Sequence, residues 1–261
     1  MLDFDKLYTP KRTGKQKNFE NGVRSEYQRD YDRLIFSSPF RRLQNKTQVF
    51  PLPGSSFVHN RLTHSLETSS VGRSLGKLAG VHISRNYSKS AESVEFYKYE
   101  LQNVIAAACL AHDIGNPAFG HSGESAISSF FERNGDQYNS DFTPAQWEDL
   151  THFEGNANAL RILTHQFDGN LPGGQRLTYT TLATILKYPC ESIGSDGSFK
   201  QWKKYGFFQS EKSIFLEIVN QFGLIQQSEN PIKYWRHPLF IFWKRQMILL
   251  IRSLISKMLI V

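Results

Sequence analysis

The stretch Ala108-Cys-Leu-Ala-His-Asp-Ile-Gly-Asn-Pro-Ala-Phe-Gly-His-Ser-Gly-Glu124 decides how this chain folds and where its reactive side chains gather. It opens as the end of an apolar helix, carries His112 beside Asp113, and then breaks at a glycine and a proline. His121 and Glu124 follow three residues apart, so one helical turn places them on the same side. The stretch therefore predicts two polar pairs on either side of a tight turn.

Each pair has a chemical interpretation and a structural alternative. A neutral imidazole beside a carboxylate is a good ligand pair for a divalent metal. The second pair, His121 with Glu124, could supply acid–base chemistry next to that metal. A histidine at a helix end is, however, more often structural, because the helix dipole stabilises it there. The dipeptide alone leaves both interpretations open.

The composition of the chain limits the classes of protein to which it can belong. The chain has 261 residues, enough for one or two domains, and 13% aromatic residues exclude a disordered chain. Cys109 and Cys190 are its only cysteines, which argues against a thiolate zinc site and favours the reducing cytoplasm as its location. The net charge of +7 favours anionic partners such as nucleotides or nucleic acid, although a generally basic surface explains it equally well.

Apolar periodicity predicts an all-α fold, a helical bundle with long loops and no strong strand alternation. Residues 1–24 are expected to form a loose basic arm, residues 84–98 a polar connection, and residues 133–151 a polar insertion anchored by Trp147. The expected helices cover residues 25–36, 40–50, 60–78, the run up to 113, 153–163, 177–188 and 213–226.

A third ligand comes from the helix that begins near residue 60. If His64 converges with His112 and Asp113, two imidazoles and one carboxylate form a metal site with open positions for water. Residues 40–50 combine arginine, lysine and glutamine side chains, which suit a ligand that carries phosphates and a sugar. The candidates for neutralising phosphates are Arg61, Arg41, Lys46 and Lys187. Together these residues predict metal-assisted hydrolysis of a phosphorylated substrate.

Six blocks of this sequence resemble the HD-domain deoxynucleoside triphosphate triphosphohydrolases, notably the bacterial dGTPases. The blocks are RDYDRLIFSSPFRRLQNKTQVF (29–50), RLTHSLE (61–67), AHDIGNPAFGHSGE (111–124), FEGNANALRIL (153–163), LTYTTLATILKYP (177–189) and RHPL (236–239). They follow one another in the family's order. The resemblance implies an HD-type domain over residues 25–239 and hydrolysis of a dNTP, with dGTP expected first, to deoxynucleoside and inorganic triphosphate.

The resemblance also implies roles for single residues. His64, His112 and Asp113 match the first three ligands of a divalent metal, Mg or Mn, with Co or Ni as alternatives. His121 and Glu124 match the catalytic pair. Arg61 matches an arginine that reaches the substrate phosphates, and Gln44 a glutamine beside the sugar. Members of the family form homo-oligomers, which we also expect for the intact protein.

Two other classes of function compete with this interpretation. One is an HD phosphohydrolase that acts on other nucleotides, against which the blocks at 40–50 and 153–163 argue. The other is a non-catalytic protein that binds nucleotide or single-stranded DNA, which the basic charge suits because lysine and arginine contacts give salt-dependent binding.

The segment 240–261 departs from the family. Relatives continue after the RHPL block with Glu-Ala-Ala-Asp-Asp-Ile, which carries the fourth metal-binding aspartate, whereas this chain has no Asp or Glu after Glu229. Codons can be chosen for residues 243–259 whose shifted reading frame encodes Glu-Ala-Ala-Asp-Asp-Ile-Ala-Tyr-Ser. We therefore expect a frameshift between Leu239 and Trp243 and little or no activity. The alternative, a basic amphipathic helix for a partner or membrane surface, is less favoured, and no membrane association is expected.

Overall fold

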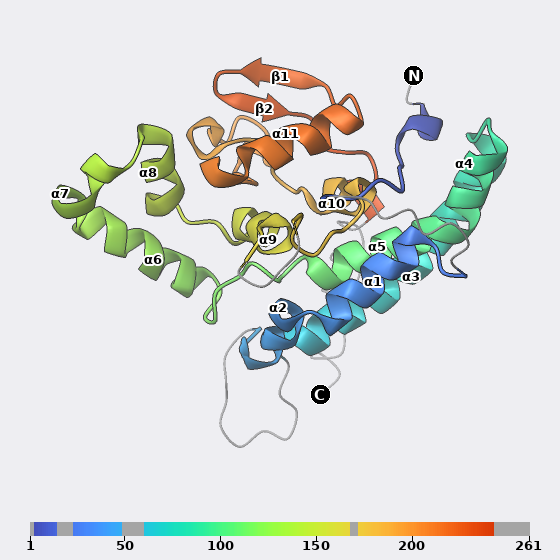
Figure 1. The fold of residues 1–261 in the computed structure, drawn as a ribbon, viewed down its shortest axis with the longest axis horizontal. Helices are drawn as coiled ribbons and strands as arrows, with labels where there is room; N and C mark the ends of the chain where they lie inside the picture. Colours follow the sequence, from blue (N-terminus) through green and yellow to red (C-terminus); the bar gives the residue numbers. More distant parts are fainter. Residues whose placement is uncertain (1–2, 15–22, 49–59, 168–171, 243–261) are drawn as a thin grey trace, which may run out of the picture.

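The computed structural model describes residues 3–14, 23–48, 60–167 and 172–242. Helices dominate this part of the chain, which confirms the all-α prediction (Figure 1). None of the described helices is long and apolar enough to cross a membrane.

The central helix is α5 (Leu101–Ala111), whose residues are almost all fully buried. The long helix α3 (Arg61–Asn86) lies along α5, and α1 (Glu26–Phe36) and α10 (Tyr179–Ile185) also pack against α5 (Figure 1). Between His64 and Ile83 the buried residues of α3 are all small, which lets the two backbones approach closely. A Cβ atom at Gly76 would lie 2.9 Å from Gln102 Cα. Close packing of α3 on α5 therefore fixes the positions of both predicted histidine ligands.

Side-chain caps set where these helices begin. Ser25 accepts a hydrogen bond from the backbone of Gln28 and caps α1, and Asn60 does the same for α3 through Thr63. Between them lie α2 (Ser38–Arg41) and a 3₁₀ turn at Arg42–Asn45. The predicted helix 40–50 is therefore shorter than expected, and residues 49–50 lie outside the described part of the chain.

The predicted polar insertion at 133–151 is helical and forms a lobe together with the helix before it. The lobe consists of α6 (His121–Arg133), α7 (Gly135–Tyr138) and α8 (Pro144–Thr151), at the left of Figure 1. Trp147 lies 6.2 Å from Phe131 between ring centroids, and the same distance from Phe142. It thus joins the two sides of the lobe, as expected of an anchor.

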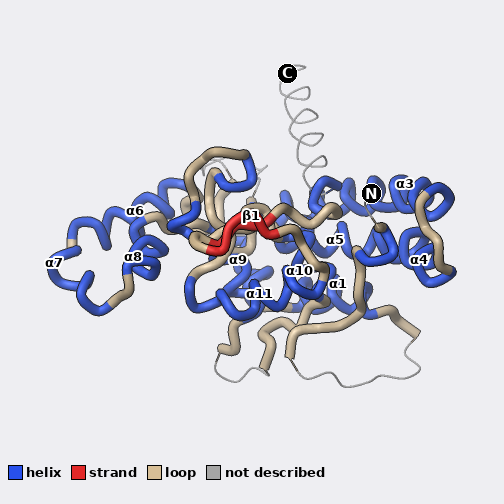
Figure 2. The backbone as a smooth tube through the Cα atoms, turned by 90° about the horizontal axis from the view of Figure 1, so that it is seen from above, coloured by secondary structure: helices blue, strands red, loops and turns tan. Residues whose placement is uncertain are grey.

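The last part of the described chain holds α9 (Gly155–Thr164), α11 (Lys212–Gln221) and a small hairpin. Strand β1 (Gln226–Glu229) pairs antiparallel with β2 (Ile232–Tyr234), which no alternation in the sequence predicted (Figure 2). Only alternate residues of the three-residue strand β2 are buried, so the pattern is too short to detect. Short 3₁₀ turns lie at Phe4–Lys6, Asn139–Asp141, Ser192–Gly194, Lys200–Trp202 and Gln209–Glu211.

The connection expected at 84–98 is helical instead. Helix α3 continues to Asn86, and α4 (Ala91–Glu95) leads through a π-helical turn at Phe96–Glu100 into α5. Phe96 and Tyr97 are buried there. These two aromatic side chains supply the packing that the polar composition around them conceals.

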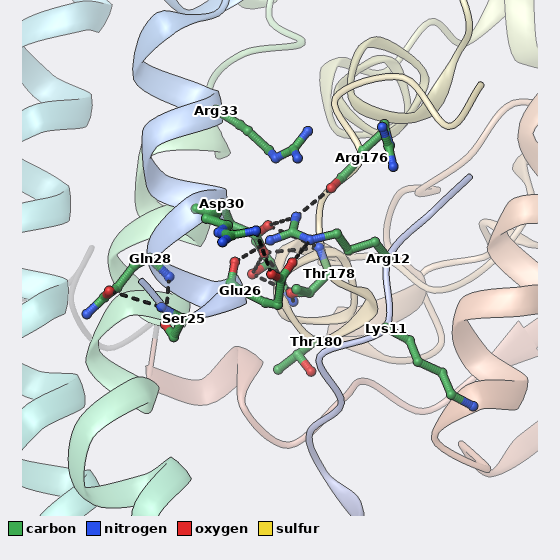
Figure 3. Close-up of polar contacts among 12 residues, drawn as sticks. Lys11, Arg12, Ser25, Glu26, Gln28, Asp30, Arg33, Arg176, Thr178 and Thr180 are labelled. Carbon is green, nitrogen blue, oxygen red and sulfur yellow. Dashed lines mark hydrogen bonds and ion pairs between the residues drawn. The ribbon is translucent and has the colours of Figure 1, made fainter. Parts of the chain in front are cut away.

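Residues 3–14 of the predicted basic arm are not loose. Arg12 is 6% exposed and donates to Asp30, which is fully buried in α1, across 2.5 Å (Figure 3). Asp30 also accepts from the backbone and hydroxyl of Thr178 and from the hydroxyl of Thr181. The buried carboxylate requires these partners, so this segment is part of the core and the prediction was wrong for it.

Candidate metal centre and acid–base pair

Three predicted ligands meet between α3 and the end of α5. One possible ligand atom from each of His64, His112 and Asp113 lies within 4.8 Å of the others, and all three residues are buried. His112 Nδ1 lies 2.6 Å from the carbonyl oxygen of Cys109. A carbonyl can only accept, so Nδ1 carries the proton and the lone pair of a neutral ring lies on Nε2. This donor set fits a divalent metal.

Asp113 is held by hydrogen bonds on both of its oxygens. Arg61 donates from Nη1 to Oδ2 across 2.7 Å, and Asn116 donates to Oδ1 across 2.8 Å. Burial alone would raise the pKa of this carboxyl, but His112 and Arg61 beside it outweigh burial and hold the pKa below its usual value. Asp113 is therefore an ionised, oriented acceptor.

The second predicted pair also forms. His121 is the first residue of α6, and its Nδ1 lies 2.6 Å from Glu124 Oε2. The other carboxylate oxygen of Glu124 accepts from the backbone N–H of Gly155 across 2.9 Å. Glu124 is 8% exposed, whereas the side chain of His121 is largely exposed. The carboxylate thus fixes an imidazole whose Nε2 remains available outside the pair.

Gly155 makes this arrangement possible. A Cβ atom there would lie 2.3 Å from Asn116 Oδ1 and 2.8 Å from Glu124 Oε1. Any larger residue would collide with both the group that orients Asp113 and the group that orients His121. The start of α9 therefore joins the two pairs.

A cleft of about 480 Å³ opens beside the acid–base pair. Lys204, which the sequence did not single out, pairs with Glu154 across 2.5 Å and lies 4.0 Å from Glu124 Oε2. The residues that line the cleft include Glu124, Ser125, Ser128, Phe153, Glu154, Lys203, Lys204 and Tyr205. Lys204 is 80 positions from Glu124 in a loop without periodicity, so only the fold could reveal it.

The fold brings some, but not all, of the side chains predicted to contact phosphate to the metal centre. Lys46 donates to the carbonyl oxygens of Ile114 and Asn116, across 3.2 and 2.6 Å, and so holds the turn after Asp113. Lys187 is half-buried; burial lowers its pKa, and the charges of Glu154 and Asp113 oppose this. Lys187 therefore faces the same acidic groups.

Arg41 and Gln44 are exposed, and no described contact joins them to the centre. Arg41 lies instead 6.0 Å from the ring of Phe36. Gln48 was not predicted, yet its Oε1 is buried and has no hydrogen-bond partner among the described residues. A buried amide oxygen without a hydrogen-bond partner is a better candidate for a ligand contact than an exposed amide oxygen.

A comparison with known protein families gives the broad class of protein that this chain resembles. Residues 61–182, which include both histidine–carboxylate pairs, match the HD domain family. The matched part of the chain extends from α3 through α9 to the start of α10.

Similarity to individual curated proteins gives a narrower class. The chain is 43% identical over 248 residues, 91% of its length, to a deoxyguanosinetriphosphate triphosphohydrolase-like protein of Synechocystis. It is 42% identical over 245 residues to one of Pseudomonas aeruginosa, and 35% identical over 246 residues to one of Listeria monocytogenes. The chain is therefore similar to dGTPase-like proteins over nearly its whole length. It spans about half the length of these relatives, 55%, 53% and 52% respectively.

Proposed function

We propose that this chain carries the metal and acid–base half of a deoxynucleoside triphosphate triphosphohydrolase, with dGTP as the expected substrate. The convergence of His64, His112 and Asp113 beside the His121–Glu124 pair carries the proposal. The names of the curated relatives support dGTP in particular. The metal would be Mg or Mn, with Co or Ni as alternatives.

His64, His112 and Asp113 would hold one divalent metal, and Lys46 holds the turn that follows Asp113. The chemistry that a metal held there would supply is a water nucleophile available near neutral pH. Arg61 then neutralises negative charge between Asp113 and the substrate phosphates, and Lys187 and Lys204 add positive charge nearby.

His121 handles the proton. Its Nδ1–H is held by Glu124, so Nε2 exchanges a proton with the ester oxygen that joins the sugar to the α-phosphate. Cleavage of the bond between phosphorus and that oxygen releases the deoxynucleoside as an alcohol. The oxygen of water remains on the triphosphate.

The test is a turnover assay of a full-length relative with the four dNTPs, with metal added and with metal chelated. We expect release of intact triphosphate, metal dependence, and the fastest turnover with dGTP. Pyrophosphate or monophosphate as the first product would contradict the mechanism. Metal binding, measured separately, would distinguish a folded but inactive chain from one without a metal site.

The expected frameshift remains a prediction, because residues 243–261 lie outside the described part of the chain. Sequencing the gene decides it. If the shifted frame lacks Glu-Ala-Ala-Asp-Asp, the frameshift is refuted. Strong metal-dependent hydrolysis by the 261-residue chain would refute the expected inactivity. The domain boundaries at 25 and 239, the cytoplasmic location and the homo-oligomer also stay predictions.

A further inference from the structure

A cavity of about 430 Å³ lies against helices α8 and α9. Of their described lining residues, this cavity and the cleft at the acid–base pair share only Phe153. The volume suits a small molecule, because binding sites for such ligands span roughly 300–1,000 Å³. We call this space the α8–α9 cavity, and its lining residues are Phe142, Gln146, Asp149, Leu150, Phe153, Asn158, Arg161, Phe208 and Ser210.

Asp149 on α8 gives the cavity a carboxylate with an unused acceptor oxygen. The residue is 4% exposed, and its Oδ2 accepts from the backbone N–H of Gln209 across 2.6 Å. Its Oδ1 is buried and has no hydrogen-bond partner among the described residues. The nearby hydroxyl of Ser192 donates instead to the carbonyl oxygen of Ala145 across 3.3 Å. Burial raises the pKa of Asp149 to about 6, so near neutral pH the group is mostly ionised and still lacks a donor.

The charges around Asp149 favour a cationic ligand. Glu211 is already paired with Arg161 across 2.6 Å, and Glu191 with Lys212 across 3.6 Å. Asp149 has no cationic partner in the part of the chain that the structure describes, so one negative charge of these three acids is not balanced. Because the only cation in the described lining is the paired Arg161, the cavity disfavours phosphates and therefore nucleotides.

The walls of the cavity fit an organic body. The rings of Phe153 and Phe208 lie 5.7 Å apart between centroids, and aromatic faces attract organic cations. Phe208 is held in place because Tyr205 and Gln209 on either side of it both donate to Asp149. A bare metal ion would need several oxygen ligands, which these apolar walls do not supply. The surface is therefore preformed for a molecule with one ammonium group and an apolar part.

We propose that the α8–α9 cavity binds a small organic cation, a primary ammonium group carried on an aromatic or aliphatic body. The ammonium group donates to the Asp149 carboxylate, and the apolar part packs against Phe142, Phe153 and Phe208. A hydrogen bond between two charged groups is stronger than one between neutral groups, so the charge of the ligand contributes much of its affinity. This site is separate from nucleotide hydrolysis.

The test is isothermal titration calorimetry of the full chain with tryptamine and with tryptophol, in metal-free buffer near neutral pH. Tryptophol has a hydroxyl group in place of the ammonium group and is otherwise the same molecule. Tryptamine should bind about 10- to 150-fold more tightly, the effect of one hydrogen bond to a charged group. Asp149→Asn should remove this difference, because the amide keeps the shape of the side chain and loses its charge.

A second variant tests the apolar wall. Phe142 is 37% exposed, so Phe142→Ala leaves the core intact and should weaken binding of both ligands. Phe130→Ala is the matched control, because Phe130 on α6 is exposed and does not line the cavity. Asp141→Asn is the control for Asp149→Asn, because Asp141 is exposed beside Phe142 and outside the lining. Both controls should leave the affinity for tryptamine nearly unchanged.

The comparison of ligands on the unaltered chain decides the proposal even if a variant fails to fold. Absence of tryptamine binding overturns the proposal, and so does tryptophol or indole-3-acetate that binds as tightly as tryptamine. Equal losses with Asp149→Asn and Asp141→Asn also overturn it. Each of these results leaves the proposed hydrolysis untouched, because Asp149 and Phe142 do not line the cleft that contains Glu124.

Discussion

Arg61 donates from Nη1 to Asp113 Oδ2 across 2.7 Å, so a predicted phosphate contact already touches a predicted metal ligand. Both residues are 8% exposed. The guanidinium of Arg61 thus contacts a predicted metal ligand directly, which a residue that only binds phosphate would not do. Its loss should therefore affect both substrate binding and the carboxylate.

The first prediction concerns this arginine. Arg61→Ala should weaken binding of all four dNTPs to a similar degree, because a phosphate contact does not read the base. It should also lower metal affinity, because Asp113 loses the partner that helps to keep it ionised and oriented. Binding of each dNTP and of metal alone can be measured by calorimetry. An altered base preference with unchanged overall affinity would show that the assignment is wrong.

The second prediction concerns His121. In a full-length relative, replacement by Ala of the residue that matches His121 should lower turnover by about 10²–10⁴, the usual range for a positioned acid–base group. The metal content should stay nearly unchanged, because the side chain is exposed and bonds to Glu124 and not to the three ligands. Turnover and metal content are measured on the same preparation. Loss of the metal would place His121 among the ligands.

The third prediction separates two glutamines. Gln44→Ala is expected from the resemblance to change discrimination between deoxy- and ribonucleotides. Gln48→Ala is the matched comparison, because its amide oxygen is buried without a described partner, whereas Gln44 is exposed. The ratio of turnover on dGTP to that on GTP is the readout. If only Gln48→Ala moves this ratio, the sugar contact belongs to Gln48.

The fourth prediction concerns His237, which is 1% exposed. Burial lowers the pKa of His237 to about 3. At pH values between this pKa and the ordinary histidine pKa, the unfolded chain therefore binds a proton at His237 that the folded chain does not bind. Stability should therefore fall as the pH drops below about 6.5, by roughly 1.4 kcal/mol per pH unit from this group. Urea unfolding at several pH values should show a smaller slope for His237→Gln. An unchanged slope would contradict the prediction, and the more exposed His165→Gln serves as control.

The fifth prediction tests whether residues 3–14 belong to the core. Arg12→Ala leaves the carboxylate of Asp30 buried beside only threonine donors, and should cost about 3–5 kcal/mol of the free energy of unfolding. Lys11→Ala, at an exposed neighbouring position, should cost little. Unfolding in urea measures both. Equal stability of the two variants would restore the interpretation of this segment as a loose arm.

Sequence reasoning reached the centre because its histidines lie on a long helix or at the end of an apolar one. His64 and His112 project from α3 and α5, whose packing follows from small and apolar residues at helical spacing. It failed where tertiary contacts decide the structure. Lys204 reaches Glu124 from a loop, and Arg12 is buried only because Asp30 and Thr178 surround it. No local pattern reports such pairings over long distances in the chain.

The buried carboxylate of Asp30 also has a consequence for how the protein is made. Its partners Thr178 and Thr181 are 148 and 151 positions later in the chain. A chain still emerging from the ribosome can form α1 and even the pairing with Arg12, but it lacks these hydroxyl groups until α10 has appeared. Contacts so distant in sequence form late because loop closure must come first. Residues 3–14 can therefore pack stably only after synthesis has passed residue 181. In chains that stall earlier, this segment should remain sensitive to proteases.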